Sequence, residues 1–266
     1  MKTQTDLDHA LLLADIADEI TSQHYLSRGL VVHSKPDKTP VTEADTAVEK
    51  ALSHTAVTKF GDSYLGEEGT RHSAGPKCWT VDPIDGTRNF LRGMPVWATL
   101  ISVKEDGRTL AAVVSAPALG RRWWASEGHG AWTRDADGRA RQLHVSSVAT
   151  LENAFLLHAS LFTWDKTTVG LPAVMDLLRG AWRHRGMGDF LNHMLVAEGA
   201  ADACLEADPK AWDLEAPQLI IQEAGGHTWT NAKSTTPPEQ PRIAISSNTL
   251  LEPTILKALG LHKTSA

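Results

Sequence analysis

Apolar residues recur at helical spacing in two stretches near the N-terminus. Over residues 5–27 one predicted helix face carries Leu13, Ala17, Ile20 and His24. Thr5 and Asp8 at the start of this stretch have the spacing of a capping box. A second helix is predicted at about 42–60, where apolar residues stand at positions 44, 48, 51, 52 and 56. Two amphipathic helices are therefore expected before the first strand.

Short apolar runs predict β-strands in the rest of the first half, at 63–66, 78–81, 96–103 and 110–117. The last two strands bracket the turn Glu105-Asp106-Gly107, which is typical of a hairpin. A second hairpin-like stretch spans 122–133 and holds three tryptophans. The segment 68–77 reads as a loop.

Strand and helix patterns alternate in the second half. Apolar runs predict strands at 153–158, 181–185, 201–206, 227–230 and 242–246. Helical spacing predicts helices near 171–179, 189–199, 212–224 and 249–259. Gly225-Gly226 is expected to end the helix before it, and 231–241 reads as a loop. The pattern predicts a layered α/β or α+β protein, a single unit over 1–266 with halves of about 1–150 and 151–266.

Composition narrows the class of protein. The chain has 266 residues, 42% of them apolar and 22% charged, with a net charge of -6. This balance argues against a disordered chain and against nucleic acid as a partner. No segment approaches the roughly 18–20 apolar residues of a membrane helix, and no secretory signal is recognisable. The cysteines Cys78 and Cys204 are expected to be buried thiols, so a soluble cytoplasmic protein is predicted.

The segment 79–90, WTVDPIDGTRNF, carries the most informative chemistry. An apolar strand leads into Asp82 and Asp85, and Pro83 between them stiffens the turn so that both carboxylates can point into one volume. Gly86-Thr87 then opens a short helical turn, whose free amides suit a phosphate. An isolated pair of aspartates with this spacing more often forms Asx turns. Here five residues of the six-residue window DPIDGT fit the same pattern, which favours a site for a hard cation beside a phosphate.

This segment resembles the signature of the inositol monophosphatase superfamily, magnesium-dependent and lithium-sensitive phosphomonoesterases. Three further motifs are similar to family elements: Gly66-Glu67-Glu68, the pair Trp212-Asp213 followed by Glu223-Ala-Gly-Gly226, and Lys35 with the segment Val41-Thr42-Glu-Ala-Asp45. The resemblance implies a layered α-β-α-β-α sandwich, assembled as a homodimer.

The resemblance also assigns metal ligands. Glu67, Asp82 and the backbone carbonyl of Ile84 would hold a first Mg²⁺, and Asp82, Asp85 and Asp213 a second. Glu67 would help to hold a weaker third ion, and Mn²⁺ is expected to substitute for Mg²⁺. Considered alone, Asp213 would fit the first turn of any helix. Its place in the combined motifs favours the ligand role.

The same resemblance implies how water and phosphate are handled. Thr87 and Asp45 would orient and deprotonate the attacking water, with Glu67 among the catalytic residues, and the amides of Gly86 and Thr87 would receive the phosphate. In-line attack without a covalent intermediate is expected. Considered alone, Asp45 would be the third helical residue of a capping box on Thr42. Glu68 is expected to face solvent or a supporting network.

Residues of the second half are implied in recognising the leaving group. Glu206 stands seven residues before Asp213, where inositol-hydrolysing relatives have an acidic substrate contact. The run from Arg185 to Asp189 resembles an R-x-x-G-D pattern of the histidinol-phosphate phosphatase branch, as does Arg121-Arg122-Trp123-Trp124-Ala125. The implied substrate contacts are Asp85, Arg185, Asp189, Glu206 and Asp213. Two carboxylates beside the leaving group would suit a cationic alcohol such as histidinol.

Simpler interpretations of these residues remain open. Asp189 would also serve as a helix N-cap, and the Trp123-Trp124 pair would also pack in a hairpin core. Three histidines are interpreted as ordinary surface or core residues: His158, His184 and His193.

The leading hypothesis is a histidinol-phosphate phosphatase of histidine biosynthesis. The alternative is an inositol or broad-specificity sugar monophosphatase with the same metals. A second phosphate, as in fructose 1,6-bisphosphate or a nucleotide 3′-phosphate, would need a basic cluster that the sequence does not suggest. A non-catalytic member of the fold is disfavoured because all four acidic positions, Glu67, Asp82, Asp85 and Asp213, are present.

Overall fold

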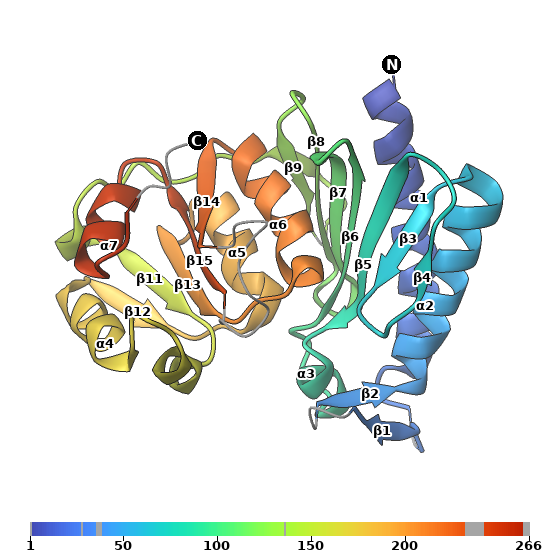
Figure 1. Ribbon diagram of the computed structural model, residues 1–266, viewed down its shortest axis with the longest axis horizontal. Helices are drawn as coiled ribbons and strands as arrows, with labels where there is room; N and C mark the ends of the chain where they lie inside the picture. Colours follow the sequence, from blue (N-terminus) through green and yellow to red (C-terminus); the bar gives the residue numbers. More distant parts are fainter. Residues whose placement is uncertain (1, 28, 36–38, 136, 232–241, 263–266) are drawn as a thin grey trace. The chain divides into compact units, whose positions relative to one another are not determined.

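The computed structural model describes the chain except for residues 1, 28, 36–38, 136, 232–241 and 263–266. The chain forms two compact units, coloured along the sequence in Figure 1. The first unit comprises Met1–Gln142 together with Ala211–Ile220, and the second comprises Leu143–Lys210 together with Ile221–Ala266. The chain therefore leaves the first unit and later returns to it.

Two N-terminal helices cover one face of the sheet in the first unit (Figure 1). These are α1 (Lys2–His24) and α2 (Glu43–Thr55), the latter continuing as the π-helical turn η1 (Ala56–Phe60). Their buried residues, among them Leu13, Ala17, Val48 and Leu52, share one core with strand residues. Both predicted helices are confirmed, but α1 begins at Lys2, upstream of Thr5, so Thr5 is not its N-cap.

The sheet of the first unit has eight strands in the order β10-β9-β8-β7-β6-β5-β3-β4. Their bounds are β3 (Ser63–Gly66), β4 (Arg71–His72), β5 (Lys77–Asp85), β6 (Ala98–Glu105), β7 (Arg108–Ala116), β8 (Arg121–Ser126), β9 (Ala131–Arg134) and β10 (Ala140–Gln142). Neighbours pair antiparallel except β3 and β5, which run parallel. Both predicted hairpins are confirmed, whereas β4 lies in the segment predicted as a loop.

The opposite face of β6 contacts the returning segment of α6 (Ala211–Glu223). Along β6, Ile101 and Val103 belong to the core under α1 and α2. Ser102 alternates with them, and its hydroxyl donates to Glu215 at 3.3 Å. Lys104, on the same side as Ser102, forms an ion pair with Glu215. This polar attachment places the start of α6 on the first unit.

Smaller elements complete the first unit. Strands β1 (Val32–Ser34) and β2 (Pro40–Thr42) form an antiparallel pair just before α2. The short helix α3 (Thr87–Leu91) follows β5, as expected from Gly86-Thr87, and a 3₁₀ turn, η2 (Pro117–Leu119), follows β7. The pair β1–β2 was not predicted, because the polar, proline-containing segment 34–40 indicates turns.

The second unit is built on a five-stranded sheet with the order β12-β11-β13-β15-β14. The strands are β11 (Phe155–His158), β12 (Arg183–Arg185), β13 (Ala203–Ala207), β14 (Gly226–Thr230) and β15 (Ile243–Asn248). The described helices are α4 (Leu171–Gly180), α5 (Asp189–Ala197) and α7 (Glu252–Ala258), with 3₁₀ turns η3 (Leu151–Asn153) and η4 (Leu161–Lys166). These strands and helices were predicted, within a few residues at their ends.

Alternation along β11 shows how this sheet is covered. Leu156 packs into a core with residues of α4 and α7, whereas Leu157 packs with Val196 of α5 and with Cys204. Helices therefore cover both faces of the sheet, α4 and α7 on one and α5 on the other. Cys204 is buried as expected, but Cys78 is only half-buried, and both thiols are free.

Two expectations from the sequence concern a loop and membrane helices. The loop predicted at 231–241 lies outside the described residues, apart from Asn231. Among the described residues, no helix has the length and apolar character required to cross a bilayer.

Candidate metal centre

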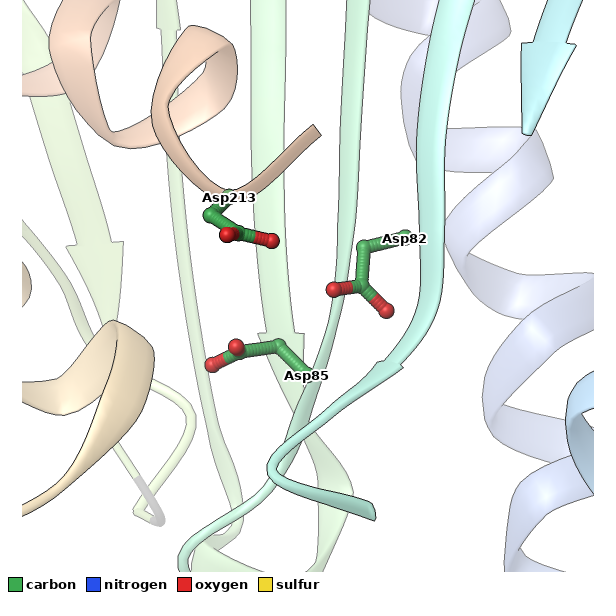
Figure 2. Close-up of side chains that lie close together, drawn as sticks. All are labelled: Asp82, Asp85 and Asp213. Carbon is green, nitrogen blue, oxygen red and sulfur yellow. The ribbon is translucent and has the colours of Figure 1, made fainter. Parts of the chain in front are cut away.

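Three carboxylates of the first unit converge at the end of β5 (Figure 2). One oxygen each from Asp82, Asp85 and Asp213 lies within 4.8 Å of the other two. Asp82 is buried, and the other two are half-buried. The first two come from β5 and the third from the first turn of α6. The structure thus brings together residues separated by nearly half of the chain, as the motifs indicated.

A β-bulge explains why Asp82 and Asp85 share one side of the strand. Residues three apart on a regular strand point to opposite faces. Asp82 lies opposite Leu100 and Asp85 opposite Ala98, so the pairing register shifts between them by one extra residue. The Ile84 amide also donates to Asp82 Oδ1 at 3.0 Å, which is the Asx turn considered from the sequence. The turn and the convergence of the carboxylates coexist.

Negative charge is concentrated around Asp82. Burial, and then the charges of Glu67, Asp85 and Asp213, raise its pKa well above the ordinary value. The donors are all carboxylate oxygens, the ligands that hard divalent cations such as Mg²⁺ and Mn²⁺ prefer. The residues present therefore fit a divalent metal, which would offset the mutual repulsion of these carboxylates.

Glu67 lies beside this cluster but pairs with a cation of the chain. Lys35 Nζ lies 2.8 Å from Glu67 Oε1 and 2.8 Å from Glu68 Oε1. Burial lowers the pKa of Lys35, yet the two glutamates outweigh it and the net shift is upward. Burial raises the pKa of Glu68 to about 7. All three residues line a cavity of about 440 Å³.

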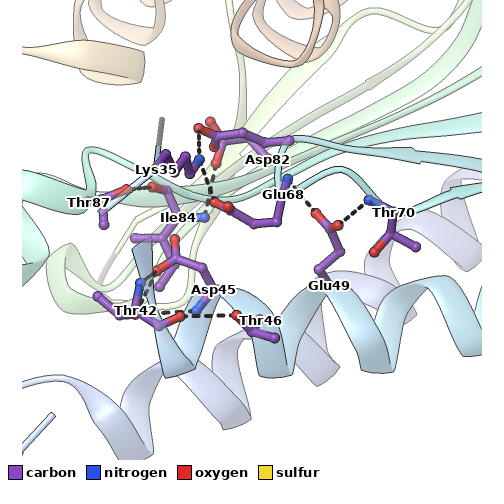
Figure 3. Close-up of polar contacts among 11 residues, drawn as sticks. Lys35, Thr42, Asp45, Thr46, Glu49, Glu68, Thr70, Asp82, Ile84 and Thr87 are labelled. Carbon is purple, nitrogen blue, oxygen red and sulfur yellow. Dashed lines mark hydrogen bonds and ion pairs between the residues drawn. The ribbon is translucent and has the colours of Figure 1, made fainter. Parts of the chain in front are cut away.

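The two glutamates thus differ from the aspartates. The cluster of three carboxylates does not include Glu67, although its charge acts on Asp82. Glu68 lies in a supporting network with Lys35, as the sequence suggested (Figure 3). Lys35 was noted only as part of a motif, and its contact with the glutamates was not predicted. A lone lysine upstream of a helix gives no signal of such a pairing.

Asp45 is held by the capping box predicted at the start of α2 (Figure 3). Asp45 Oδ2 accepts hydrogen bonds from the Thr42 amide at 2.7 Å and from the Thr42 hydroxyl at 2.6 Å. Its other oxygen, Oδ1, is buried and has no hydrogen-bond partner among the described residues. Burial raises the pKa of Asp45 to about 6, and the charge of Glu67 contributes to the increase. One carboxylate oxygen is thus fixed, and the other remains available.

The turn after the bulge positions Thr87. The Thr87 hydroxyl donates to the Ile84 carbonyl at 3.0 Å (Figure 3). Gly86 caps α3 with a φ of 84°, a left-handed conformation that glycine adopts without strain. The first amides of such a helical turn have no partner within the helix. Thr87 therefore contacts the carbonyl that the family resemblance implies as a metal ligand.

The substrate residues expected from the sequence lie in the second unit, with the exception of Asp85 and Asp213. Arg185 is exposed on β12, and its guanidinium donates to the neighbouring His184 carbonyl at 2.7 Å. Asp189 begins α5, but Gly188 is the N-cap, so the N-cap interpretation of Asp189 is wrong. Asp189 has a φ of 46°, which is rare for a residue with a side chain and costly unless the surroundings enforce it.

Glu206, on β13, accepts a hydrogen bond from a buried histidine. His193 Nε2 lies 2.8 Å from Glu206 Oε2, and His193 Nδ1 lies 2.9 Å from Ser246 Oγ. His193 was interpreted as an ordinary surface or core residue, so this contact was not predicted. A histidine among the mostly apolar residues of this predicted helix was the available signal.

The remaining sequence candidates have packing roles. Trp123 is buried in β8 with the Arg121 guanidinium 4.6 Å from its ring centroid. Arg122 pairs with Asp15 and Asp18 of α1. The segment therefore joins β8 to α1, in line with the packing interpretation.

Comparison with known proteins identifies relatives of similar length. A histidinol-phosphatase from Streptomyces coelicolor is 44% identical over 250 residues, covering 92% of this chain and 93% of the relative. A histidinol-phosphatase from Mycobacterium tuberculosis is 44% identical over 257 residues, covering 96% and 98%. A solved inositol monophosphatase from Zymomonas mobilis has a TM-score of 0.80 at 27% identity, covering 97% and 98%.

These likenesses confirm the predicted layered α/β fold. The model of the inositol monophosphatase family matches residues 3–264, which is nearly the whole chain. The matched range includes the converging carboxylates Asp82, Asp85 and Asp213. The chain therefore belongs to the inositol monophosphatase family.

Proposed function

We propose that this protein is a metal-dependent histidinol-phosphatase, a phosphoric monoester hydrolase that converts L-histidinol phosphate to L-histidinol and phosphate. The observation that supports this most is the similarity, over nearly the whole chain, to two proteins named histidinol-phosphatase. The convergence of Asp82, Asp85 and Asp213 supports a metal-assisted reaction rather than a binding role.

Mg²⁺ is the proposed cofactor, two or three ions per subunit, with Mn²⁺ as a substitute. Asp82, Asp85 and Asp213 would hold one ion; Glu67, Asp82 and the Ile84 carbonyl would hold another. Bound divalent ions supply charge that neutralises the phosphate dianion, lowers the pKa of a water and stabilises the leaving oxygen. Lithium sensitivity is proposed with the metal site, and lithium inhibition of phosphate release tests it.

The chain's own groups would manage the proton and the phosphate. Asp45 Oδ1, which has no hydrogen-bond partner in the described part of the chain, can accept a proton from the attacking water, and a carboxyl pKa of about 6 suits a base near neutral pH. The Thr87 hydroxyl uses its hydrogen on Ile84, so its oxygen can accept a hydrogen bond from the same water. The amides of Gly86 and Thr87 would receive a phosphate oxygen.

The leaving group would be recognised by carboxylates of the second unit. L-Histidinol carries an ammonium group, and Asp189 and Glu206 offer two negative charges for it. Arg185, exposed on β12 of the same unit, would donate a hydrogen bond to the substrate. A neutral polyol needs no such pair of charges. The φ of 46° at Asp189 is the kind of enforced conformation found at functional positions.

Phosphate release tests the function directly. We expect faster release from L-histidinol phosphate than from D-myo-inositol 1-phosphate or fructose 1,6-bisphosphate, and loss of all release with EDTA. Asp213→Asn should abolish turnover and weaken Mn²⁺ binding in calorimetry, whereas Asp176→Asn, an exposed aspartate paired with Arg179, should change neither. Preference for inositol phosphate would overturn the substrate assignment and favour the alternative.

Asp189→Asn tests recognition of the cation. Turnover of L-histidinol phosphate should fall more than turnover of p-nitrophenyl phosphate, because only the first substrate carries a positive leaving group. Equal losses for the two substrates would contradict a role for Asp189 in binding the ammonium.

A homodimer is proposed from the family resemblance. Light scattering coupled to size-exclusion chromatography should give twice the mass of a 28.8 kDa chain. The mass of a single chain would contradict it.

A further inference from the structure

A chain of hydrogen bonds crosses the buried core of the second unit and ends at Glu206. Thr228 Oγ1 and Ser246 Oγ are 2.9 Å apart, and Ser246 Oγ is 2.9 Å from His193 Nδ1. His193 Nε2 is 2.8 Å from Glu206 Oε2. The first three residues are at most 4% exposed, whereas the Glu206 side chain is 16% exposed. The network therefore leads from the core to a carboxylate that solvent can reach.

The strand register places these side chains on one face of the sheet. Ser246 of β15 lies opposite Thr228 of β14 and opposite Cys204 of β13. Glu206 is two residues beyond Cys204 and so points to the same face. Cys204 packs with Val196 of α5, the helix that carries His193 and lies along these strands (Figure 1). Four elements thus supply one network.

The donors and acceptors can be arranged so that every hydrogen bond of the network is satisfied. In one such arrangement the Thr228 hydroxyl donates to Ser246 Oγ, the Ser246 hydroxyl donates to His193 Nδ1, and His193 Nε2–H donates to Glu206 Oε2. Every hydrogen bond then has one donor and one acceptor. Ser246 holds the ring of His193, and His193 holds one oxygen of Glu206.

An apolar residue at position 193 would be the ordinary solution for this core. The buried neighbours along α5 include Phe190, Met194 and Val196. A polar chain within such a core is costly unless every member is satisfied. A glutamate side chain has several rotatable bonds, and freezing them reduces the entropy lost when a ligand binds. The network therefore holds the carboxylate in place before a ligand arrives.

We infer that His193 is a positioning residue that fixes the Glu206 carboxylate for a cationic leaving group and so contributes to substrate selectivity. This inference rests on the proposed function, in which Glu206 contacts the ammonium of L-histidinol phosphate. His193 itself does not contact the substrate. Its contribution is the orientation of Glu206.

The test compares two substrates and two substitutions. His193→Leu removes both ring hydrogen bonds and should raise the KM for L-histidinol phosphate about tenfold, the effect of losing one hydrogen bond to a charged group. The kcat for this substrate, and both constants for p-nitrophenyl phosphate, should stay within about twofold. His193→Gln, whose amide can donate to Glu206, should restore much of the KM. His144→Leu, an exposed histidine of the same unit, serves as the control.

Three results would overturn the inference: equal losses on both substrates, an unchanged KM in His193→Leu, or no recovery in His193→Gln. Failure of the proposed function would be seen separately, as a wild-type enzyme that does not prefer L-histidinol phosphate. In that case the positioning is tested by a double-mutant cycle. The free energies of unfolding in urea are compared for His193→Leu, Glu206→Gln and the double variant. Non-additive effects would support it, and additive effects would refute it.

Discussion

Gly66→Ala should destabilise the first unit because no side chain fits at this position. A Cβ there would lie 2.2 Å from Oε2 of Glu49, a buried residue of α2. Glu49 accepts hydrogen bonds from the amides of Glu68 at 2.9 Å and Thr70 at 2.7 Å (Figure 3). The φ of Gly66 is not positive, so the backbone itself tolerates alanine. The three atoms nearest to this Cβ all belong to the Glu49 carboxylate.

The magnitude follows from the two hydrogen bonds. The Glu49 carboxylate must rotate away, and each hydrogen bond to a charged group contributes about 1.5–3 kcal/mol. Alanine also lowers the conformational entropy of the unfolded chain, which stabilises the folded protein by about 0.4–1 kcal/mol. A net loss of about 3 kcal/mol in the free energy of unfolding is expected. For a chain of this size that corresponds to a decrease in Tm of roughly 6–10 °C.

A double-mutant cycle in urea isolates this cause. Glu49→Ala should destabilise the protein by a similar amount, and Gly66→Ala should cost little more in that background because the clashing carboxylate is gone. Mn²⁺ affinity should also decrease in Gly66→Ala, since Glu67 is the next residue. A Gly66→Ala protein within about 0.5 kcal/mol of wild type, or additive effects in the cycle, would refute the reasoning.

Three further predictions concern single side chains. Thr42→Ala should cost about 1–2 kcal/mol in thermal unfolding and slow catalysis, because the side-chain cap of α2 and the hydroxyl's hydrogen bond to Asp45 are lost together. Burial raises the pKa of Tyr64 well above 10.0, and its hydroxyl has no hydrogen-bond partner within the described part of the chain. The folded state therefore keeps this proton while the unfolded chain loses it, so stability falls as pH rises above 10.0; Tyr64→Phe should be at least as stable in urea at pH 7 and less sensitive to alkali. Burial raises the pKa of both thiols, so a thiol reagent should modify Cys78 slowly and Cys204 only in denaturant.

Local patterns predicted most helices and strands because apolar residues recur along each of them with the period of a helix or a strand. The face of Leu13 and Ala17 is buried as expected, and the Thr42 capping box forms with the predicted partner. The short strands β4 and β10 were missed because their few, mostly polar residues show no alternation. The first turn of α1 was missed because the Thr5 pattern resembles a cap inside a longer helix.

The site was predictable in its residues but not in its supporting contacts. Asp82 and Asp85 belong to one compact motif, and a second motif supplies Asp213, which converges with them. The pairing of Lys35 with two glutamates depends on how separate loops meet, which no local spacing encodes. The bond from His193 to Glu206 depends in the same way on the packing of α5 against β13.

The return of α6 to the first unit has a consequence during synthesis. Met1–Gln142 supplies every strand of the eight-stranded sheet and two of the three converging aspartates, but Asp213 is translated only after the intervening segment. At ordinary elongation rates that interval lasts several seconds. A nascent chain can therefore contain every strand of the sheet while Asp213, the third aspartate of the cluster, has not yet been synthesised. Ribosome-stalled chains ending before and after residue 213 should differ in ion retention even where their sheets are equally folded.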